Sequence, residues 1–307
     1  MGGYAIMKKI LLGGSPCTFW SVAQRSKKIE KGWELFENYA IAMEKFAPDF
    51  FLYENNYAIP RDVVARISDA LQTRPQLIDS ALVSAQRRKR LYFHNFGEVA
   101  LPPDKNASFQ DIIEKDPEVC RIYALNETQS RVEFWNNGKN KCGGYKKCAN
   151  ITNASKTYCL TTKQDRAPNA GLIEYDGFCR TLTVGEACRL QTLPKDYCDC
   201  VSKTQAFRML GNGWTADVIS YLLNVGLKNV PRDEELHVLS LYDGIATGLY
   251  CLKKLGFKKI RYHAYEIDKA AVKVAKSNHP EIVEMGDAYQ VRGNWRWENK
   301  ENEKSIL

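Results

Sequence analysis

The amino-acid sequence predicts an α/β fold, built around a sheet that is wound with helical crossovers. Two observations lead to this class. Short apolar runs that end in glycine or polar residues are typical of buried strands, and they alternate with segments whose apolar residues recur at helical spacing. The length of 307 residues is enough for one large domain or two modest ones, each with a buried core.

The first third of the chain shows this alternation most clearly. The run "DFFLYENN" is apolar up to its polar end, as expected of a buried parallel strand, and "GWELFENYAIAMEKF" carries one apolar face at helical spacing. Strands or extended segments are expected at 4–14, 49–56, 77–86 and 90–96, and helices at 32–46 and 61–72.

The pattern is lost in the middle of the chain and returns near its end. Residues 101–175 are polar, with Asn, Lys and Gly clusters typical of loops and short strands. Helices are expected at 183–191 and 215–227, followed by a charged linker at about 226–236. After the linker, a strand that runs into a glycine turn, a helix, a strand, a helix and a strand are expected at 236–248, 248–257, 259–268, 270–280 and 281–287.

This last strand–helix–strand–helix–strand segment carries a cofactor signal. Gly244 and Gly248 follow its first strand, where a glycine turn lets a ligand approach the backbone at a helix N-terminus. The glycines do not form the dinucleotide fingerprint, and Glu266 ends the second strand, where it can hydrogen-bond ribose hydroxyls. A glycine-poor segment with acidic Glu266 and Asp287 suits a nucleoside cofactor without a pyrophosphate. The segment therefore favours S-adenosylmethionine, and an ordinary βα turn is the alternative.

A second candidate site lies near the start of the chain. In "GGSPC", Cys17 follows a proline at the end of a buried-looking strand, where a thiol is well placed to act as a nucleophile. A buried structural cysteine is the alternative. Only three strands fit after the linker, too few for a stable wound sheet, so the remaining strands must come from the N-terminal third. The chain thus reads as a rearranged sheet, with its two ends expected close together.

Composition limits the function classes. The formal net charge of +8 favours a polyanionic partner, although ordinary enzymes carry a similar excess. The ten cysteines lack zinc-ligand spacing and no secretory signal opens the chain, so reduced thiols and no metal are expected. No apolar run is long enough to cross a membrane, and a cytoplasmic location is expected.

Six stretches together resemble successive motifs of the cytosine-5 DNA methyltransferase family. They are "GGSPC", "ENN" at 54–56, "QRRKR" at 86–90, "RTLTVGEACRLQTLP" at 180–194, "MLGNGW" at 209–214 and "LSLYDGIATG" at 239–248. Their wording is closest to the de novo branch and its phage and bacterial relatives, and their order is cyclically permuted. The resemblance implies a Rossmann-like S-adenosylmethionine-dependent methyltransferase sheet, circularly permuted, with a smaller target-recognition domain. The expected domains are a nucleophile half at 1–98, the recognition domain at 99–205 and a cofactor half at 206–307.

The resemblance implies a set of catalytic residues. Cys17 would add to C6 of a cytosine flipped out of a short double-stranded DNA sequence, and Glu54 would contact the base at N3 and its amino group. Arg88 and Arg90 alternate along an expected extended segment, so their side chains would share one face and orient the base and its phosphate. A solvated edge or plain phosphate contacts are the alternatives for this basic run.

The resemblance also implies binding residues. For S-adenosylmethionine and its product S-adenosylhomocysteine these are Pro16, Asn212, Gly213, Trp214, Tyr242, Asp243, Gly244, Ile245, Thr247, Glu266, Ile267, Asp287 and Ala288. Tyr242 stands where the family usually has phenylalanine, and its hydroxyl is expected to be tolerated if it points outward. Candidate DNA contacts are Ser21, Arg25, Lys27, Gln86, Lys139, Lys141, Lys146 and Lys147.

The expected partner is double-stranded DNA, bound by a monomer without membrane association. A cognate restriction endonuclease and a prokaryotic or phage source would fit this reading. A tRNA cytosine-5 methyltransferase has the same catalytic set and stays open as an alternative. A catalytically inactive DNA-binding accessory protein is the alternative from another class, although such relatives lose the nucleophile or break the cofactor turn.

Overall fold

The computed structural model describes residues 7–20, 29–125, 129, 150–165 and 168–293, without the side chains of Cys17 and Phe178. The chain divides into two compact units. The sheet unit comprises Met1–Ile78, Lys89–Ala100 and Ser220–Leu307, and the loop-rich unit comprises Asp79–Arg88 and Leu101–Ile219. The division expected from the sequence, at 1–98, 99–205 and 206–307, stays a prediction.

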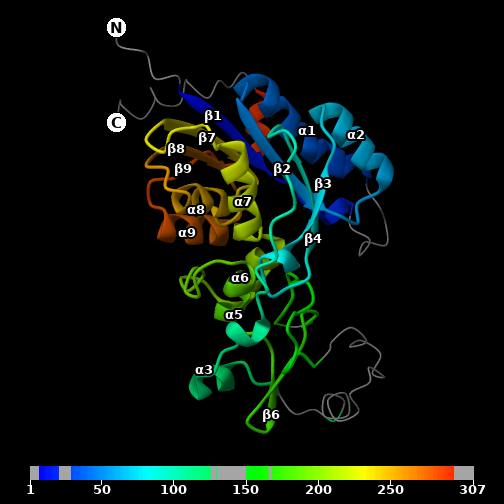
Figure 1. Cartoon of the computed structure of the whole chain (residues 1–307), viewed down its shortest axis with the longest axis vertical. Helices are drawn as coiled ribbons and strands as arrows, with labels where there is room; N and C mark the ends of the chain where they lie inside the picture. Colours follow the sequence, from blue (N-terminus) through cyan, green and yellow to red (C-terminus); the bar gives the residue numbers. More distant parts are fainter. Residues whose placement is uncertain (1–6, 21–28, 126–128, 130–149, 166–167, 294–307) are drawn as a thin grey trace. The chain divides into compact units, whose positions relative to one another are not determined.

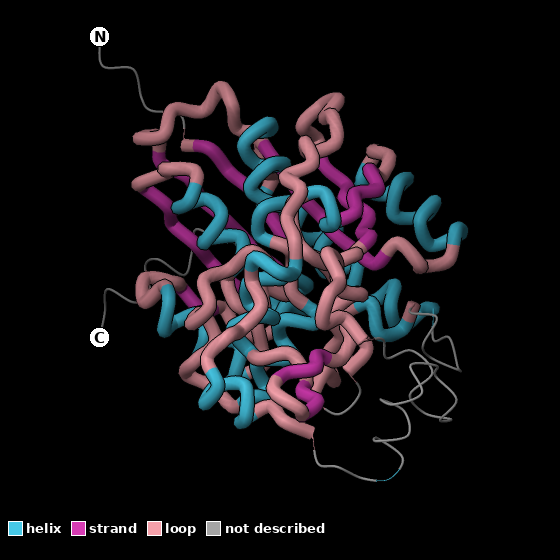
Figure 2. Tube along the Cα trace, turned by 60° about the horizontal axis from the view of Figure 1, so that its bottom comes forward, coloured by secondary structure: helices cyan, strands magenta, loops and turns pink. Residues whose placement is uncertain are grey.

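A seven-stranded sheet with the strand order β3-β4-β2-β1-β7-β8-β9 organises the sheet unit (Figures 1 and 2). Its strands are β1 (Lys8–Gly13), β2 (Phe50–Asn56), β3 (Gln76–Asp79), β4 (Lys89–His94), β7 (Glu235–Leu241), β8 (Lys259–Tyr265) and β9 (Val283–Glu284). Strands β2, β1, β7, β8 and β9 pair in parallel, which confirms the wound α/β class. The first strand of the chain therefore lies at the centre of the sheet, between strands from both parts of the sequence.

Strand β4 departs from the parallel pattern, because it pairs antiparallel to β2. Its register places Arg90 opposite Asn56, at the carboxyl end of β2. The strand expected at 281–287 is shorter than predicted, since only Val283 and Glu284 form β9. The sequence could not reveal either feature, because strand direction and length depend on the neighbouring strand.

Helices cover both faces of the sheet. Helices α1 (Ile29–Phe46) and α2 (Arg61–Leu71) share one apolar core with β1, β2, β4, β7 and β8. Helix α8 (Thr247–Lys254) lies on the opposite face, because a Cβ at Gly248 would meet Leu12 of β1 and Tyr262 of β8 at 2.7 Å. Figure 1 shows α9 (Lys269–Asn278) beside α8, and α7 (Ala216–Gly226) runs across the boundary between the two units.

Both ends of the described chain meet the last turn of α1. The Nζ atom of Lys9 donates to the carbonyl of Phe46 at 3.2 Å, and Nζ of Lys45 donates to the carbonyl of Gly293 at 2.6 Å. The last turn of α1 thus connects the first strand of the sheet unit to its last described segment. None of the helices among the described residues is long and apolar enough to cross a membrane.

The loop-rich unit contains little regular structure (Figure 2). Its elements are α3 (Pro117–Ile122), β5 (Ile173–Tyr175), β6 (Phe178–Arg180), α5 (Val184–Leu190) and α6 (Lys203–Asn212). The extended segment predicted at 77–86 is wrong beyond Asp79, since 80–82 form a 3₁₀ turn. Helix α6 was missed, although Ser202 and Gln205 form a capping box that marks its start in the sequence.

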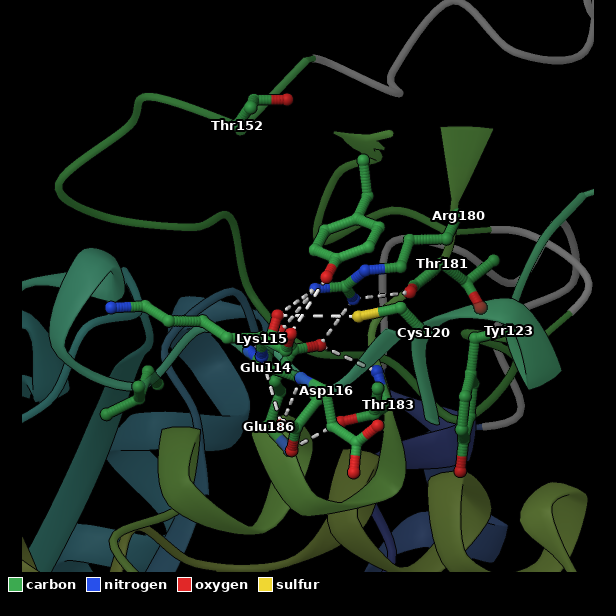
Figure 3. A network of polar contacts seen from close by, with 12 residues as sticks. Glu114, Lys115, Asp116, Cys120, Tyr123, Thr152, Arg180, Thr181, Thr183 and Glu186 are labelled. Atoms are coloured by element: carbon green, nitrogen blue, oxygen red, sulfur yellow. Dashed lines mark hydrogen bonds and ion pairs between the residues drawn. The ribbon is translucent and has the colours of Figure 1, made fainter. Parts of the chain in front are cut away.

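A buried ion pair anchors this unit (Figure 3). The guanidinium of Arg180 makes two parallel hydrogen bonds to the carboxylate of Glu186, at 2.9 and 2.8 Å, and both side chains are fully buried. The carboxylate also accepts from the backbone N–H groups of Glu114 and Thr183, each at 2.7 Å. The pair thereby fastens the segment before α3 to the start of α5.

Candidate active site

The turn that carries the predicted nucleophile is pressed against β2. A Cβ at Gly14 would lie 2.8 Å from the backbone oxygen of Glu54, so only glycine allows this approach. The hydroxyl groups of Ser15 and Tyr53 hydrogen-bond at 2.6 Å, and Nδ2 of Asn55 donates to the Ser15 carbonyl at 3.2 Å. These contacts hold Gly14 and Ser15 against β2, beside Glu54.

Cys17 begins a 3₁₀ turn, Cys17–Phe19, directly after this segment. Its side chain lies outside the described residues, so its role as nucleophile stays a prediction. Pro16 is exposed at the start of the turn. The segment continues to Trp20, which is fully buried and whose Nε1 donates to the carbonyl of Ile29 at 3.1 Å, at the beginning of α1.

Glu54 is held by one of the two predicted arginines. Nε of Arg90 lies 3.1 Å from Oε1 of Glu54, and the two side chains are only 13% and 11% exposed. The antiparallel pairing of β2 and β4 produces this contact, because Arg90 stands near the end of β2. An ion pair that is largely withdrawn from water fixes the carboxylate in one orientation.

Arg88 has a different environment from the one predicted. It precedes β4 instead of alternating along it, and it is 2% exposed, so it is not part of a solvated edge. Its guanidinium donates to three backbone carbonyls, those of Leu160 at 3.1 Å, Gly211 at 3.0 Å and Gly213 at 2.7 Å. In this structure Arg88 therefore organises the backbone of the loop-rich unit instead of presenting its charge to a base or phosphate.

Gln86 needs a similar correction. It was a candidate DNA contact, but it is fully buried. Its Nε2 donates to the carbonyl of Leu190 at 2.7 Å and to Oε1 of Gln191 at 3.0 Å, and its Oε1 accepts from the N–H of Leu160 at 3.2 Å. Both ends of the amide are satisfied within the scaffold, which leaves it no surface to offer to DNA.

The glycine turn after β7 has an unusual backbone. Tyr242, Gly244 and Ala246 all have positive φ, at 59°, 66° and 61°, which is rare for the two residues that are not glycine. Such strain persists where surrounding contacts impose it, and it is frequent at ligand sites. Here Glu266 braces the turn, because its Oε2 accepts from the N–H of Gly244 at 2.9 Å.

The carboxyl ends of β7, β8 and β9 gather acidic groups. Burial, together with the charge of nearby Glu266, raises the pKa of Asp243 to about 6, although the hydroxyl of Tyr262 donates to its Oδ1 at 2.6 Å. Burial and then the charge of Asp243 raise the pKa of Glu284 to about 7. Asp287 caps the following 3₁₀ turn, Ala288–Arg292, by accepting from the N–H of Tyr289.

Two observations indicate that these residues suit a nucleoside cofactor. A Cβ at Gly244 would meet nothing within 4 Å, so the turn opens onto free space. Ile267, next to Glu266, is 71% exposed, an uncovered apolar side chain beside polar groups. Ile245, Thr247 and Ala288 are buried.

Tyr242 differs from the expectation for its hydroxyl. The hydroxyl does not point outward: it accepts from Nδ2 of Asn38 at 2.9 Å and donates to the carbonyl of Leu35 at 2.7 Å, both on α1. Burial raises the pKa of this phenol above its ordinary range. Sequence reasoning missed Asn38, because a lone asparagine on an apolar helix face carries no motif.

The remaining predicted residues fall into two groups. Asn212 is the last residue of α6, and Gly213 and Trp214 follow it in the loop-rich unit, where the Gly213 carbonyl accepts from Arg88. Candidate DNA contacts that lie outside the described residues are Ser21, Arg25, Lys27, Lys139, Lys141, Lys146 and Lys147. Over the described part of the chain, no group of three or more His, Cys, Asp or Glu side chains could hold a metal ion.

In comparisons with known proteins, the chain is similar to cytosine-5 DNA methyltransferases. The model of the C-5 cytosine-specific DNA methylase family matches residues 5–62 and 80–226. DNA (cytosine-5)-methyltransferase DRM2 of Oryza sativa subsp. japonica is 27% identical over 228 residues, which cover 69% of this chain and 36% of that protein. DNA (cytosine-5)-methyltransferase DRM1 of Arabidopsis thaliana is 25% identical over 253 residues, which cover 75% of this chain and 38% of that protein. The chain spans well under half the length of these relatives, and because they are plant proteins they do not support the prokaryotic or phage source expected from motif wording.

Solved structures show the same fold. A mutant of Spodoptera frugiperda DNMT2 matches with a TM-score of 0.52 and 19% identity, over 71% of this chain and 79% of that chain. The S. pombe Dnmt2 methyltransferase matches with a TM-score of 0.51 and 14% identity, over 73% of this chain and 78% of that chain. At these identities the likeness concerns the mixed α/β fold alone.

The family model therefore spans the turn before Cys17, the strands that carry Glu54 and Arg90, and the helices of the loop-rich unit. It covers well over half of the chain, and the curated relatives carry the same type of name. The chain belongs to the C-5 cytosine-specific DNA methylase family of S-adenosylmethionine-dependent methyltransferases.

Proposed function

We propose that this protein transfers a methyl group from S-adenosylmethionine to C5 of cytosine in double-stranded DNA, through a covalent adduct between Cys17 and C6 of the base. One observation carries the proposal: the turn before Cys17 is locked against Glu54, whose carboxylate is oriented by Arg90 at 3.1 Å. A nucleophile segment beside an oriented carboxylate is the arrangement that activation of a cytosine ring requires.

The proposed chemistry assigns one task to each residue. The Cys17 thiolate adds to C6, while Glu54 holds a proton at N3, so that the electron pair of the C5–C6 bond becomes available at C5. S-adenosylmethionine, when bound, would supply the methyl group from its positively charged sulfur; transfer to C5 would break the sulfur–methyl bond and leave S-adenosylhomocysteine. Loss of the C5 proton to a base and breakage of the C6–S bond then release methylcytosine and free Cys17. Because C5 and C6 are inaccessible inside a stacked duplex, the target base would be flipped out.

The cofactor is assigned to the acidic edge of the sheet. The residues proposed to hold it there are Tyr242, Asp243, Gly244, Ile245, Thr247, Glu266, Ile267, Asp287 and Ala288. The open space at Gly244 and the exposed apolar surface of Ile267 support this assignment. Pro16 and residues 212–214 are proposed for the methionine end.

A circular permutation of the family order belongs to the same proposal. Two observations support it. The family model stops at residue 226, before the glycine turn, and β7, which leads into that turn, lies beside β1 in the parallel sheet. A monomeric state and a cognate restriction endonuclease stay predictions from the sequence.

The first experiment is methyl transfer from radiolabelled S-adenosylmethionine to mixed-sequence duplex DNA and, in parallel, to tRNA. We expect label in DNA cytosine that is lost in Cys17→Ala and kept in Cys200→Ala, a partly exposed cysteine of the loop-rich unit. The names of the curated relatives favour DNA over RNA. Label in tRNA alone would move the protein to the RNA alternative, and binding of DNA without transfer would favour the inactive accessory protein.

A further inference from the structure

Helix α1 carries a buried amide on its apolar face. Asn38 is 0% exposed, although its neighbours Phe36, Tyr39 and Ala42 belong to the apolar core of the sheet unit. Burying an amide is costly unless its donor and acceptor both find partners. The hydrogen-bond partners of Asn38 therefore show why an amide is buried at this position of α1.

Both ends of the Asn38 amide are used, and each reaches a distant part of the sequence. Its Nδ2 donates to the hydroxyl of Tyr242 at 2.9 Å, and its Oδ1 accepts from Nε of Arg292 at 2.6 Å. These partners are 204 and 254 residues away along the chain. Tyr242 begins the turn after β7, and Arg292 ends the 3₁₀ turn that Asp287 caps. One amide thus joins α1 to two of the three acidic strand ends.

Arg292 makes further contacts with the same helix. Its Nη2 donates to the carbonyl of Glu34 at 2.6 Å and lies 3.3 Å from Oε2 of Glu37. Its guanidinium also lies over the ring of Tyr289, 5.2 Å from the ring centroid. The side chain is therefore bound along one turn of α1 and cannot swing away without losing several charge-assisted hydrogen bonds.

A lysine from the end of α1 completes the attachment. Nζ of Lys45 donates to the carbonyls of Val291 and Gly293, each at 2.6 Å. Ala288 and Val291 are buried in the core that α1 helps to form, so the attachment has an apolar component as well. We call Asn38, Lys45, Arg292 and the Tyr242 hydroxyl the α1 clamp.

The other end of α1 is fixed to the nucleophile segment. Trp20, which follows the 3₁₀ turn of Cys17, donates to the Ile29 carbonyl, and a Cβ at Gly32 would come within 2.3 Å of its Nε1. Helix α1 therefore contacts the nucleophile segment at its start, and the turn of Tyr242 and the 3₁₀ turn that Asp287 caps along its middle and end. A rigid helix of 18 residues is suited to transmit position between the two.

We propose that Asn38 and Arg292 are positioning residues for the methyl donor: through the α1 clamp they fix the turn of Tyr242 and the turn of Asp287 in the geometry that binds it. The proposal rests on the cofactor site assigned above to these turns. The Tyr242 hydroxyl and the Arg292 guanidinium both donate to carbonyls of α1, so their loss weakens binding of the cofactor more than it slows the chemical step.

The test is binding of S-adenosylhomocysteine to the full chain, measured by calorimetry. We expect Arg292→Ala and Tyr242→Phe to bind it about tenfold more weakly, because each loses two or more hydrogen bonds that involve buried or charged groups. Tyr242→Phe removes a single oxygen, so it keeps the test decisive if Arg292→Ala folds poorly. Arg261→Ala is the matched control: its exposed ion pair with Glu235 lies at the opposite end of β7, and binding should stay within about twofold.

Steady-state kinetics distinguish positioning from general structural damage. In Arg292→Ala we expect a raised KM for S-adenosylmethionine with kcat nearly unchanged, and partial recovery in Arg292→Lys, which can still reach α1 carbonyls. If wild type binds S-adenosylhomocysteine and both clamp variants bind it equally well, the clamp proposal is wrong while the proposed function stands. If wild type itself binds none, the assignment of the cofactor site fails, and the clamp proposal fails with it.

Discussion

Replacing Glu186 by glutamine should destabilise the loop-rich unit more than any exposed charge change. The carboxylate accepts four hydrogen bonds, two from the Arg180 guanidinium and two from the backbone N–H groups of Glu114 and Thr183. In glutamine, one of the two oxygens becomes an NH₂ group, which faces donors and can accept from none of them. The fully buried guanidinium of Arg180 is then left without its counter-charge.

The magnitude follows from this geometry. Breaking a buried ion pair by removing one partner costs about 3–5 kcal/mol, a substantial part of a total stability of about 5–15 kcal/mol. Replacing both partners by apolar residues often restores stability when a pair is isolated. Here it should not, because Arg180→Met with Glu186→Leu removes the acceptor of two backbone N–H groups, the buried one of Thr183 and the partly buried one of Glu114, and an unpaired buried group costs about 1–3 kcal/mol.

Urea unfolding followed by circular dichroism and tryptophan fluorescence would measure these free energies. Lys105→Met is the control, since its pair with Asp217 lies in the same unit with the lysine 53% exposed, and a loss of at most about 1 kcal/mol is expected. A loss of less than about 1 kcal/mol in Glu186→Gln would refute the reasoning. Full recovery in the double variant would show that the backbone contacts contribute little.

Three further predictions follow from single contacts. Because burial raises the pKa of Asp243 to about 6, the folded state holds the proton of this carboxyl more tightly than the unfolded state does. The resulting stabilisation is complete below about pH 4 and is lost as the pH rises towards 6. Asp243→Asn should therefore show a smaller loss of stability in melting curves recorded from about pH 4 to pH 8, and an unchanged dependence on pH would contradict the prediction. Gly211→Ala should lower the free energy of unfolding by about 1–3 kcal/mol, since the new Cβ would lie 2.4 Å from the Thr161 backbone. Gly185→Ala is the control: its Cβ would have its nearest contact at 3.4 Å, so it should unfold like wild type in the same urea titration. Glu54→Gln should lower kcat by about 100-fold or more in the methyl-transfer assay with S-adenosylhomocysteine binding unchanged, and a change in binding alone would place Glu54 in the cofactor site instead.

Local patterns in the sequence predicted most of the elements. Helices α1 and α2 and strands β1, β2, β7 and β8 lie where apolar periodicity placed them, because each buries one continuous apolar face or run. The motifs predicted the family, which the family model and the curated relatives confirm. They also located the turn before Cys17 and the turn after β7, since glycine-rich turns leave a direct mark in the sequence.

Side-chain environments were decided by the tertiary structure. Arg88 and Arg90 are two residues apart in one basic run, yet Arg88 binds buried backbone carbonyls and Arg90 binds Glu54. No local pattern distinguishes the environments of the two arginines, because these environments depend on where β4 begins and on its antiparallel pairing with β2.

The hydroxyl of Tyr242 illustrates the same limit over a longer range. Its partners on α1 lie more than 200 residues away along the sequence, and Asn38 and Arg292 are likewise separated by more than 200 residues. The sequence by itself determined which segments form strands, helices and glycine turns, because those choices depend on neighbouring residues. Only the folded sheet decided which buried polar groups meet, because hydrogen bonding of a buried group depends on whichever segment the topology brings against it.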